Sequence, residues 1–201
     1  MAEADSWNQR YVDGRTGWDL GAVPPVIHRE AEAWIATHGE AARASASVLV
    51  PGAGRAHDAR GWAKAGFPTT AVDFAPLALR EAEALARADG VELELVEADV
   101  TALPAPWKDR FAVVWEQTCL CALPVELREP YLDELRRVVM PDGLVLALLW
   151  NHGNEGGPPW DMTEALVRRL VEGRFEVLSR EAVADSPAGR SGEWLWRLRA
   201  L

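Results

Sequence analysis

Short apolar runs alternate with longer amphipathic segments along this chain. The runs predict buried strands, because a strand covered on both faces has no polar positions to alternate with. A weaker run, in which Val91, Leu93 and Leu95 alternate with glutamates, is typical of a half-buried strand at a sheet edge. The predicted buried strands occupy residues 47–50, 69–73, 111–115 and 144–150.

The amphipathic segments between these runs predict helices. The first helix follows Pro24 and Pro25, which suit a helix start, and it ends near Gly39. Asp161 and Glu164 have the spacing of a capping box and predict a further helix start. The other predicted helices span residues 58–65, 75–88 and 127–138.

The order of these elements predicts the fold class. Repeated strand–helix alternation is typical of an α/β fold with a doubly wound, Rossmann-like sheet. The last two predicted strands, residues 175–180 and 193–201, have no helix between them and should form an antiparallel hairpin. We therefore expect a seven-stranded, mostly parallel sheet with a C-terminal hairpin. No linker is visible, so we expect one domain over residues 1–201 with an N-terminal helical extension at residues 1–40.

Composition and charge narrow the classes of partner. The net charge of −10 over 201 residues argues against nucleic acid and anionic membranes. The longest apolar run, residues 144–150, is too short to span a bilayer, and the N-terminus lacks an apolar signal segment. We expect a soluble, cytoplasmic protein. Ten tryptophans against two tyrosines are an excess, and tryptophan both fills cores and stacks on cations or flat ligands.

The cysteine and histidine content argues against stabilisation by disulfide bonds or by a zinc site. Cys119 and Cys121 are one residue apart, so a bond between them closes no useful loop. Histidine and cysteine do not occur anywhere with the spacing of a zinc site, and we expect no metal. Both cysteines are expected to be buried strand thiols without a catalytic role.

A glycine turn gives the first chemical signal. The strand that ends at Val50 continues into Pro51, Gly52, Ala53 and Gly54, at the sheet edge where open α/β sheets bind ligands. The glycines allow a ligand to approach the backbone closely. Residue 57 is His57, so the third glycine of the dinucleotide fingerprint is missing, which disfavours a pyrophosphate-binding nicotinamide site.

Acidic residues follow the next two strands. Asp73 ends the second strand, where a carboxylate can accept hydrogen bonds from both hydroxyls of a ribose. Asp99 follows the third strand, where a carboxylate can meet an adenine amino group. This combination fits an adenosine without a diphosphate, and S-adenosylmethionine (SAM) is the natural candidate.

Several spaced motifs carry a family resemblance. The N-terminal motif reads Trp7-x-x-x-Tyr11-x-x-Gly14-x-Thr16-x-Trp18-Asp19-x-Gly21. The others are Val50-Pro51-Gly52-Ala53-Gly54-Arg55-x-x-Asp58, Val72-Asp73, residues 115–123, Leu127-Arg128 and Gly156-Gly157-Pro158-Pro159-Trp160. Over about residues 7–160 the chain resembles the thiopurine S-methyltransferase superfamily, and most closely its halide/thiol methyltransferase branch.

The resemblance implies a class I SAM-dependent methyltransferase fold in which residues 1–40 form a lid over the cofactor. Aromatic faces attract the sulfonium cation of SAM, and an aromatic lid excludes water. Tyr11 stands where a second tryptophan is usual, and Gln117 where relatives have tyrosine or arginine. A purely structural role, pinning the N-terminal helix to the sheet, stays open for Trp7 and Trp18. The implied cofactor positions are Trp7, Tyr11, Trp18, Gly52, Asp73, Asp99, Val100 and Gln117.

We expect the methyl acceptor to bind at residues that follow the later strands. An aromatic pocket suits a soft, polarizable acceptor such as a thiol, a thiopurine, a halide or a chalcogen oxyanion. A neutral thiol needs a proton acceptor, for which Asp19 is the candidate; a turn or capping role is the alternative. The candidate acceptor-binding residues are Trp18, Leu120, Trp150, Asn151 and Trp160.

The sequence therefore favours a SAM-dependent methyltransferase that acts on a small molecule, as a monomer or weak homo-oligomer. Three alternatives stay open. The first is a SAM-dependent O- or N-methyltransferase of a small metabolite, because the cofactor half of the site is shared. The second is a nicotinamide-dependent oxidoreductase, and the third is a binding module without turnover.

Overall fold

The computed structural model describes residues 2–187 and 189–201 of the chain. They fall into two compact units, Met1–Val100 and Thr101–Leu201. Within the described residues, no helix is long and apolar enough to cross a membrane. The prediction of one domain over the whole chain stays a prediction.

The first unit is built on three parallel strands. β2 (Thr69–Asp73) pairs with β1 (Val48–Pro51) on one side and with β3 (Glu94–Glu97) on the other. All residues of β1 and β2 are buried, whereas Glu94 and Glu97 of β3 are exposed, as the alternating pattern predicts for a sheet edge. The helices of this unit are α1 (Ala2–Val12), α2 (Pro25–His38), α3 (Glu40–Arg43), α4 (His57–Lys64) and α5 (Pro76–Asp89).

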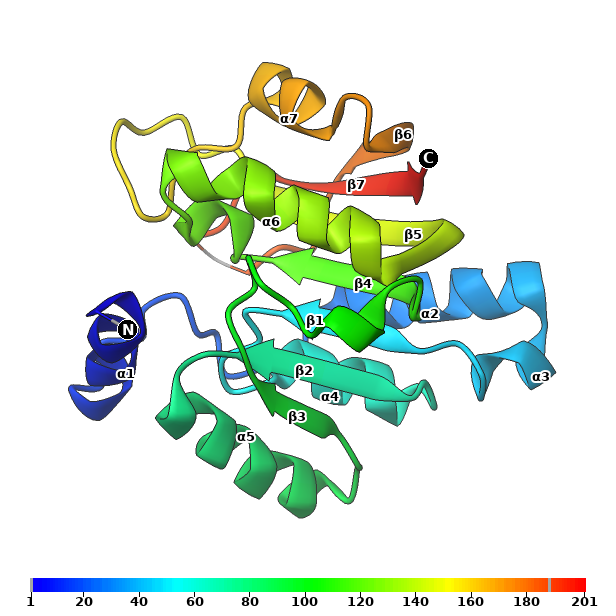
Figure 1. Cartoon of the computed structure of the whole chain (residues 1–201), viewed down its shortest axis with the longest axis horizontal. Coiled ribbons are helices and arrows are strands. Elements are labelled where there is room, and N and C mark those ends of the chain that lie inside the picture. Colours follow the sequence, from blue (N-terminus) through cyan, green and yellow to red (C-terminus); the bar gives the residue numbers. More distant parts are fainter. Residues whose placement is uncertain (1, 188) are drawn as a thin grey trace. The chain divides into compact units, whose positions relative to one another are not determined.

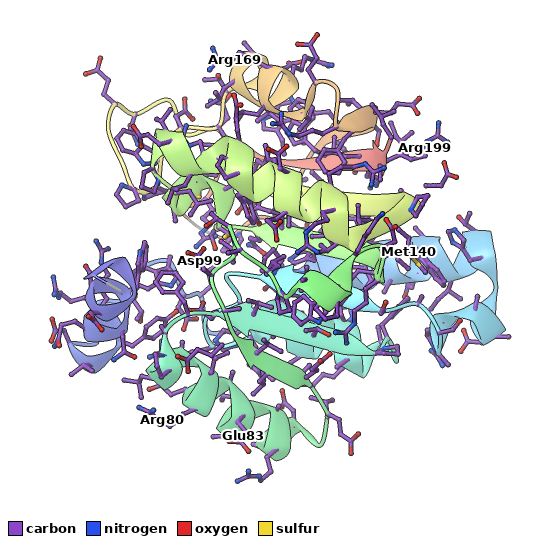
Figure 2. The ribbon with its side chains drawn as sticks, in the orientation of Figure 1. Arg80, Glu83, Asp99, Met140, Arg169 and Arg199 are labelled. Atoms are coloured by element: carbon purple, nitrogen blue, oxygen red, sulfur yellow. The ribbon has the colours of Figure 1, made fainter. Side chains whose placement is uncertain are left out.

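Helix α5 shows how the sequence sets the bounds of these helices. It begins at Pro76, which lacks the N–H that a first helical residue does not need, and ends at Gly90, whose φ is +67°. Its buried stripe is alanine-rich and it contacts β2 and β3, while Arg80 and Glu83 point outward (Figures 1 and 2). Helix α1 contacts α5 as well, which brings the N-terminal segment close to the start of this helix.

The second unit carries four strands. β4 (Phe111–Gln117) pairs in parallel with β5 (Val139–Trp150). β7 (Glu193–Ala200) is antiparallel to both β5 and β6 (Phe175–Ala182). Helix α6 contacts β5 and α7 (Figure 1). The helical elements of this unit are η1 (Ala105–Trp107), η2 (Leu120–Ala122), α6 (Val125–Val138) and α7 (Glu164–Val171).

The predicted fold class is confirmed. The described residues hold seven strands alternating with helices, the strand pairs within the units are parallel up to β5, and the C-terminal strands are antiparallel.

Two local predictions were wrong. The strand predicted at residues 144–150 begins earlier, because β5 extends back to Val139; its register against β4 shifts between Phe111 and Val113, and Asp142 has a φ of +60°. The extra residues form a bulge instead of ending a strand. The expected capping box is also absent from the start of α7: the N-cap is Thr163, whose Oγ1 accepts a hydrogen bond of 3.3 Å from the N–H of Leu166.

Close packing of α4 gives a testable consequence. A Cβ on Gly61 would lie 2.5 Å from Cγ1 of Val23 and 3.3 Å from Cγ2 of Ile27. We expect Gly61→Ala to lower the free energy of unfolding by about 1–3 kcal/mol through overpacking. The expected loss is opposite in sign to the effect of helix propensity, because alanine normally stabilises a helix by roughly 1 kcal/mol relative to glycine. Urea denaturation measures the change.

A second variant identifies the cause of that change. Val23→Ala removes the methyl groups that a Cβ at Gly61 would meet. In this background, we expect Gly61→Ala to cost much less or to stabilise. If Gly61→Ala alone were as stable as the parent chain, the packing described for α4 would be contradicted.

Candidate functional site

The turn after β1 has a backbone that ordinary side chains rarely adopt. Gly52 has a φ of +59° and Gly54 a φ of +53°. A Cβ on Gly54 would lie 2.7 Å from the hydroxyl oxygen of Tyr11. Glycine is therefore required at position 54 for two reasons, the backbone angle and the approach of α1. The second reason places the N-terminal helix directly on the glycine turn.

Asp73, at the end of β2, holds this turn. Its Oδ2 accepts a hydrogen bond of 2.8 Å from the N–H of Gly54, and its Oδ1 accepts one of 2.8 Å from the N–H of Ala75. Burial raises the pKa of the Asp73 carboxyl, and the backbone N–H donors counteract that rise. Each carboxylate oxygen has a second lone pair, so Asp73 can fix the turn and still accept a bond from a ligand hydroxyl.

The remaining predicted cofactor residues differ in exposure. Asp99 is exposed in the segment after β3 (Figure 2), and the neighbouring Val100 is buried. In the second unit, Gln117 ends β4 and is buried, and its Oε1 has no hydrogen-bond partner within residues 2–187 and 189–201. Leaving a buried acceptor unpaired costs free energy. This oxygen therefore fits a donor supplied by a ligand.

Three predicted lid residues form one aromatic cluster. The ring of Trp18 is edge-on to Trp7 at a centroid distance of 5.1 Å and to Tyr11 at 5.8 Å. Tyr11 is buried, and both tryptophans are half-buried. The guanidinium carbon of Arg10 lies 4.7 Å from the ring centroid of Trp7 and 5.9 Å from that of Trp18. These rings thus already attract a cation from the chain itself.

Asp19 has two hydrogen-bond donors and a close contact with His57. Its carboxylate accepts from Arg55 Nη1 at 2.6 Å and from the N–H of Gly21 at 2.8 Å, and it lies 3.0 Å from His57 Nε2. Burial acts to raise the pKa of this carboxyl, but the hydrogen bonds from His57, Arg55 and Gly21 overcome it and hold the pKa well below its usual range. A carboxylate stabilised in this way is a weak base. The geometry favours the alternative role that the sequence left open, in forming a turn, over a general base.

Four of the five predicted acceptor residues lie around two loops of the second unit, whereas Trp18 belongs to the first unit. Leu120 is buried in η2, directly after β4. The N–H of Trp160 donates to the carbonyl of Cys121 at 2.7 Å, which brings the Gly-Pro loop against this turn. The carbonyl of Trp150 accepts from the N–H of Met162 at 3.1 Å. These bonds bring the ends of β4 and β5 together with Trp160.

Asn151 has a structural role in the same region. Its Nδ2 lies 2.8 Å and 3.0 Å from the two carboxylate oxygens of Asp161. The N–H of His152 donates to Asp161 Oδ1 at 2.7 Å. Asp161, expected at a helix start, therefore ties down the loop after β5. Trp150 is held from the other side, because its Nε1 donates to the carbonyl of Ser191 at 2.9 Å.

Arg128 on α6 is a residue that the sequence reasoning did not assign. Its side chain is buried, and its guanidinium carbon lies 5.7 Å from the ring centroid of Trp160. Nε donates to the carbonyl of Leu123, whereas Nη2 has no hydrogen-bond partner in the part of the chain that the structure describes. The sequence did carry a signal for the burial of Arg128. Its helical spacing from Tyr131 and Leu135 puts it on the buried stripe of α6.

The two cysteines lie beyond β4 rather than within it, so their expected place in a strand was wrong. Both are buried, after the end of β4 at Gln117. Glu116 Oε1 accepts hydrogen bonds from the N–H groups of Cys119 at 3.0 Å and Leu120 at 2.7 Å, which shapes the turn. Burial and the charge of Glu116 raise the pKa of Cys121 to about 12. Among the described residues, no group of His, Cys, Asp and Glu is arranged to hold a metal ion.

Burial separates the ten tryptophans. Trp115 is completely buried in β4 and belongs to the core. Trp194 is half-buried, and its ring centroid lies 3.4 Å from the guanidinium carbon of Arg180. The other half-buried tryptophans are the four proposed around the site: Trp7, Trp18, Trp150 and Trp160. The other buried ones are Trp34, Trp62, Trp107 and Trp196.

Comparison with known proteins gives one consistent family. The family model described as thiopurine S-methyltransferase matches residues 2–194. A thiopurine S-methyltransferase of Xanthomonas campestris pv. campestris is 27% identical over 194 residues, covering 89% of this chain and 86% of that protein. Thiocyanate methyltransferase 1 of Brassica oleracea is 25% identical, covering 95% of this chain and 82% of that protein.

Solved structures share the fold. One is the 1,6-didemethyltoxoflavin-N1-methyltransferase of Burkholderia thailandensis, solved with 1,6-didemethyltoxoflavin and S-adenosylhomocysteine bound. It has a TM-score of 0.73 and is 22% identical, and the match covers 98% of this chain and 86% of that one.

The burial of both cysteines predicts slow thiol chemistry. Because burial raises the pKa of Cys121 to about 12, this thiol stays protonated at pH 8. We expect neither cysteine of the native protein to react with a disulfide reagent at that pH within minutes, and both to react in urea. Absorbance of the released thiolate measures this. Rapid reaction of either native thiol would contradict the packing of the turn after β4.

Proposed function

The chain belongs to the thiopurine S-methyltransferase family and is a SAM-dependent methyltransferase, and we propose that it methylates a small, soft nucleophile. The proposed acceptors are a thiol, a thiopurine, a halide or a chalcogen oxyanion. The family resemblance stated from the sequence is confirmed, and the nicotinamide oxidoreductase alternative is not supported.

The residues proposed to hold SAM fit it in three respects. The glycine turn exposes backbone at the end of β1, Asp73 has lone pairs for ribose hydroxyls, and the buried Gln117 Oε1 accepts a donor. Bound SAM supplies an electrophilic methyl group on a sulfonium cation. The proposed set remains Trp7, Tyr11, Trp18, Gly52, Asp73, Asp99, Val100 and Gln117.

Arg128 is the observation that supports a soft, anionic acceptor. Its buried guanidinium lies beside Trp160, and Nη2 has no partner among the described residues. A buried guanidinium with an unused N–H favours a negatively charged or strongly accepting group next to it. The polarizable ring of Trp160 favours the same acceptor over a small alcohol or amine. The proposed acceptor-binding residues remain Trp18, Leu120, Trp150, Asn151 and Trp160.

Methyl transfer from SAM to an anionic acceptor then requires mainly that the protein position the two reactants. An anionic acceptor is already a nucleophile, so proton removal by a side chain is not required. Arg128 stabilises and orients the acceptor, and the aromatic side chains exclude water that would solvate it. Orientation of this kind contributes on the order of 7–11 kcal/mol in favourable intramolecular reactions. Asp19, with its low pKa and its bonds to Arg55 and Gly21, shapes the turn.

Other expectations from the sequence stay predictions. These are a cytoplasmic location, a monomer or weak homo-oligomer, no nucleic-acid or membrane partner, and residues 1–40 acting as a lid within one domain. O- or N-methylation of a small metabolite is the competing acceptor class, and binding without turnover is the competing non-enzymatic role.

An acceptor panel tests the proposal. Methyl-labelled SAM is supplied with aromatic thiols, iodide and selenite, and in parallel with phenols and amines of matched shape. We expect label in the S-, Se- or halide-methylated products, with phenols and amines at background. Label only in O- or N-methyl products would overturn the acceptor class, and SAM binding without any product would favour the binding module.

Removal of Arg128 tests the residue that supports the acceptor class. We expect Arg128→Met to raise the acceptor KM at least about tenfold, because a charged hydrogen bond is lost. Titration calorimetry should give an unchanged SAM affinity. Arg169→Met, on the exposed face of α7 (Figure 2), is the matched control. An unchanged KM in Arg128→Met would contradict the role of this guanidinium.

The cofactor side is tested with the two acids. Asp73→Ala removes a proposed ribose acceptor, and we expect it to weaken SAM binding by about 1–3 kcal/mol. Asp99→Ala should weaken binding in the same direction without disturbing the glycine turn, because Asp99 is exposed. Calorimetry with SAM measures both. Unchanged affinity in both variants would contradict the proposed cofactor set.

A further inference from the structure

Arg55 connects three segments of the first unit. It directly follows Gly54, and its guanidinium Nη1 donates to Asp19 Oδ2 at 2.6 Å and to Thr16 Oγ1 at 3.0 Å. On its other side, Nε donates to Glu81 Oε2 on α5 at 2.5 Å. One side chain therefore joins the glycine turn, helix α5 and the loop between α1 and α2, residues 13–24.

The same loop carries Trp18. This residue lies between Thr16 and Asp19, both of which Arg55 binds, so its backbone is fixed on either side. The guanidinium carbon of Arg55 also lies 5.4 Å from the ring centroid of Tyr11, whose ring packs against Trp18. The position of the aromatic cluster thus depends on the ion pairs of Arg55 as well as on ring packing.

His57 adds a second contact to Asp19. Arg60 Nη2 donates to His57 Nδ1, so in the neutral ring the proton is on Nε2, which faces Asp19 Oδ1 at 3.0 Å. Arg60 is itself paired with Asp89. Asp19 is therefore bound from both ends of the segment Arg55–His57, which leads from the glycine turn into α4. Asp19 and Arg55 are each only partly exposed, so their ion pair is less screened than a surface pair.

We propose that Arg55 is a positioning residue for the cofactor: it holds loop 13–24, and with it Trp18, against the glycine turn and α5. The inference rests on the proposed cofactor role of Trp18 and Gly52 but not on the identity of the acceptor. Arginine suits this role because its planar group presents several N–H donors in fixed directions, which lysine does not. Arg55 acts through the loop and takes no part in the chemistry.

Two measurements on Arg55→Met test this role. We expect the Kd for SAM to rise on the order of tenfold, as for loss of a charged hydrogen bond. We also expect hydrogen exchange of the amides in loop 13–24 to accelerate without ligand, while β1 and β2 keep their protection. At saturating SAM and acceptor, kcat should fall much less than kcat/KM for SAM. Arg55→Lys should restore part of the affinity, because it keeps the charge.

Coupling to Asp19 separates positioning from a general loss of stability. Asp19→Asn should show the same two effects, and adding it to Arg55→Met should change little further, because both variants break the same contact. Arg15→Met is the control. Arg15 lies in the same loop and pairs with Asp13 at the surface, so SAM affinity and loop exchange should stay unchanged.

The outcomes decide the proposal. An unchanged Kd for SAM and unchanged loop exchange in Arg55→Met would overturn it, as would fully additive effects with Asp19→Asn. If Arg55→Met does not fold, Asp19→Asn alone decides on the same two readouts. Failure of the thiols, iodide and selenite in the acceptor panel would refute the proposed acceptor without affecting this test, which needs only SAM or no ligand.

Discussion

The first unit depends on the left-handed backbone of the turn after β1. Gly52 and Gly54 adopt positive φ angles, which frees the N–H of Gly54 to bind Asp73 from the neighbouring strand. The lack of a Cβ at Gly54 admits the hydroxyl of Tyr11, and with it α1. The fixed carboxylate of Asp73 and the docking of the N-terminal helix therefore follow from one local constraint. It is also where we propose that the adenosine of SAM binds.

Charged side chains held away from water have different roles in the two units. In the first unit, Arg55 and Asp19 are paired and bound to further partners, so they order the loop that carries Trp18. In the second unit, Arg128 is buried beside Trp160 with one nitrogen unused among the described residues. A satisfied pair stabilises a structure, whereas an unsatisfied buried cation favours binding of an anion. The contrast between these arginines separates a positioning role from a binding role.

Sequence patterns predicted the elements of the fold better than the contacts of the site. Apolar runs and proline–glycine boundaries are local signals, so strands such as β2 and helices such as α5 agreed closely with the structure. The bulge at Asp142 depends on pairing with a strand distant in sequence and was missed. The cap at Thr163 is local, because its partner is the N–H of Leu166, but the spacing of Asp161 and Glu164 pointed to another residue. Asp19 was recognised as polar and suitably placed, but its saturation by donors from another segment has no local signature. The buried position of Arg128 did have one, in its helical spacing.

The central claim is methyl transfer to an acceptor that is already anionic, without a base from the protein. It is tested most directly by the pH dependence of kcat/KM for a series of thiols of different acidity at saturating SAM. We expect the rate to rise with pH up to an apparent pKa that follows the pKa of each free thiol. An apparent pKa that stayed the same for every thiol would reveal a protein base and contradict transfer to an acceptor that is already anionic.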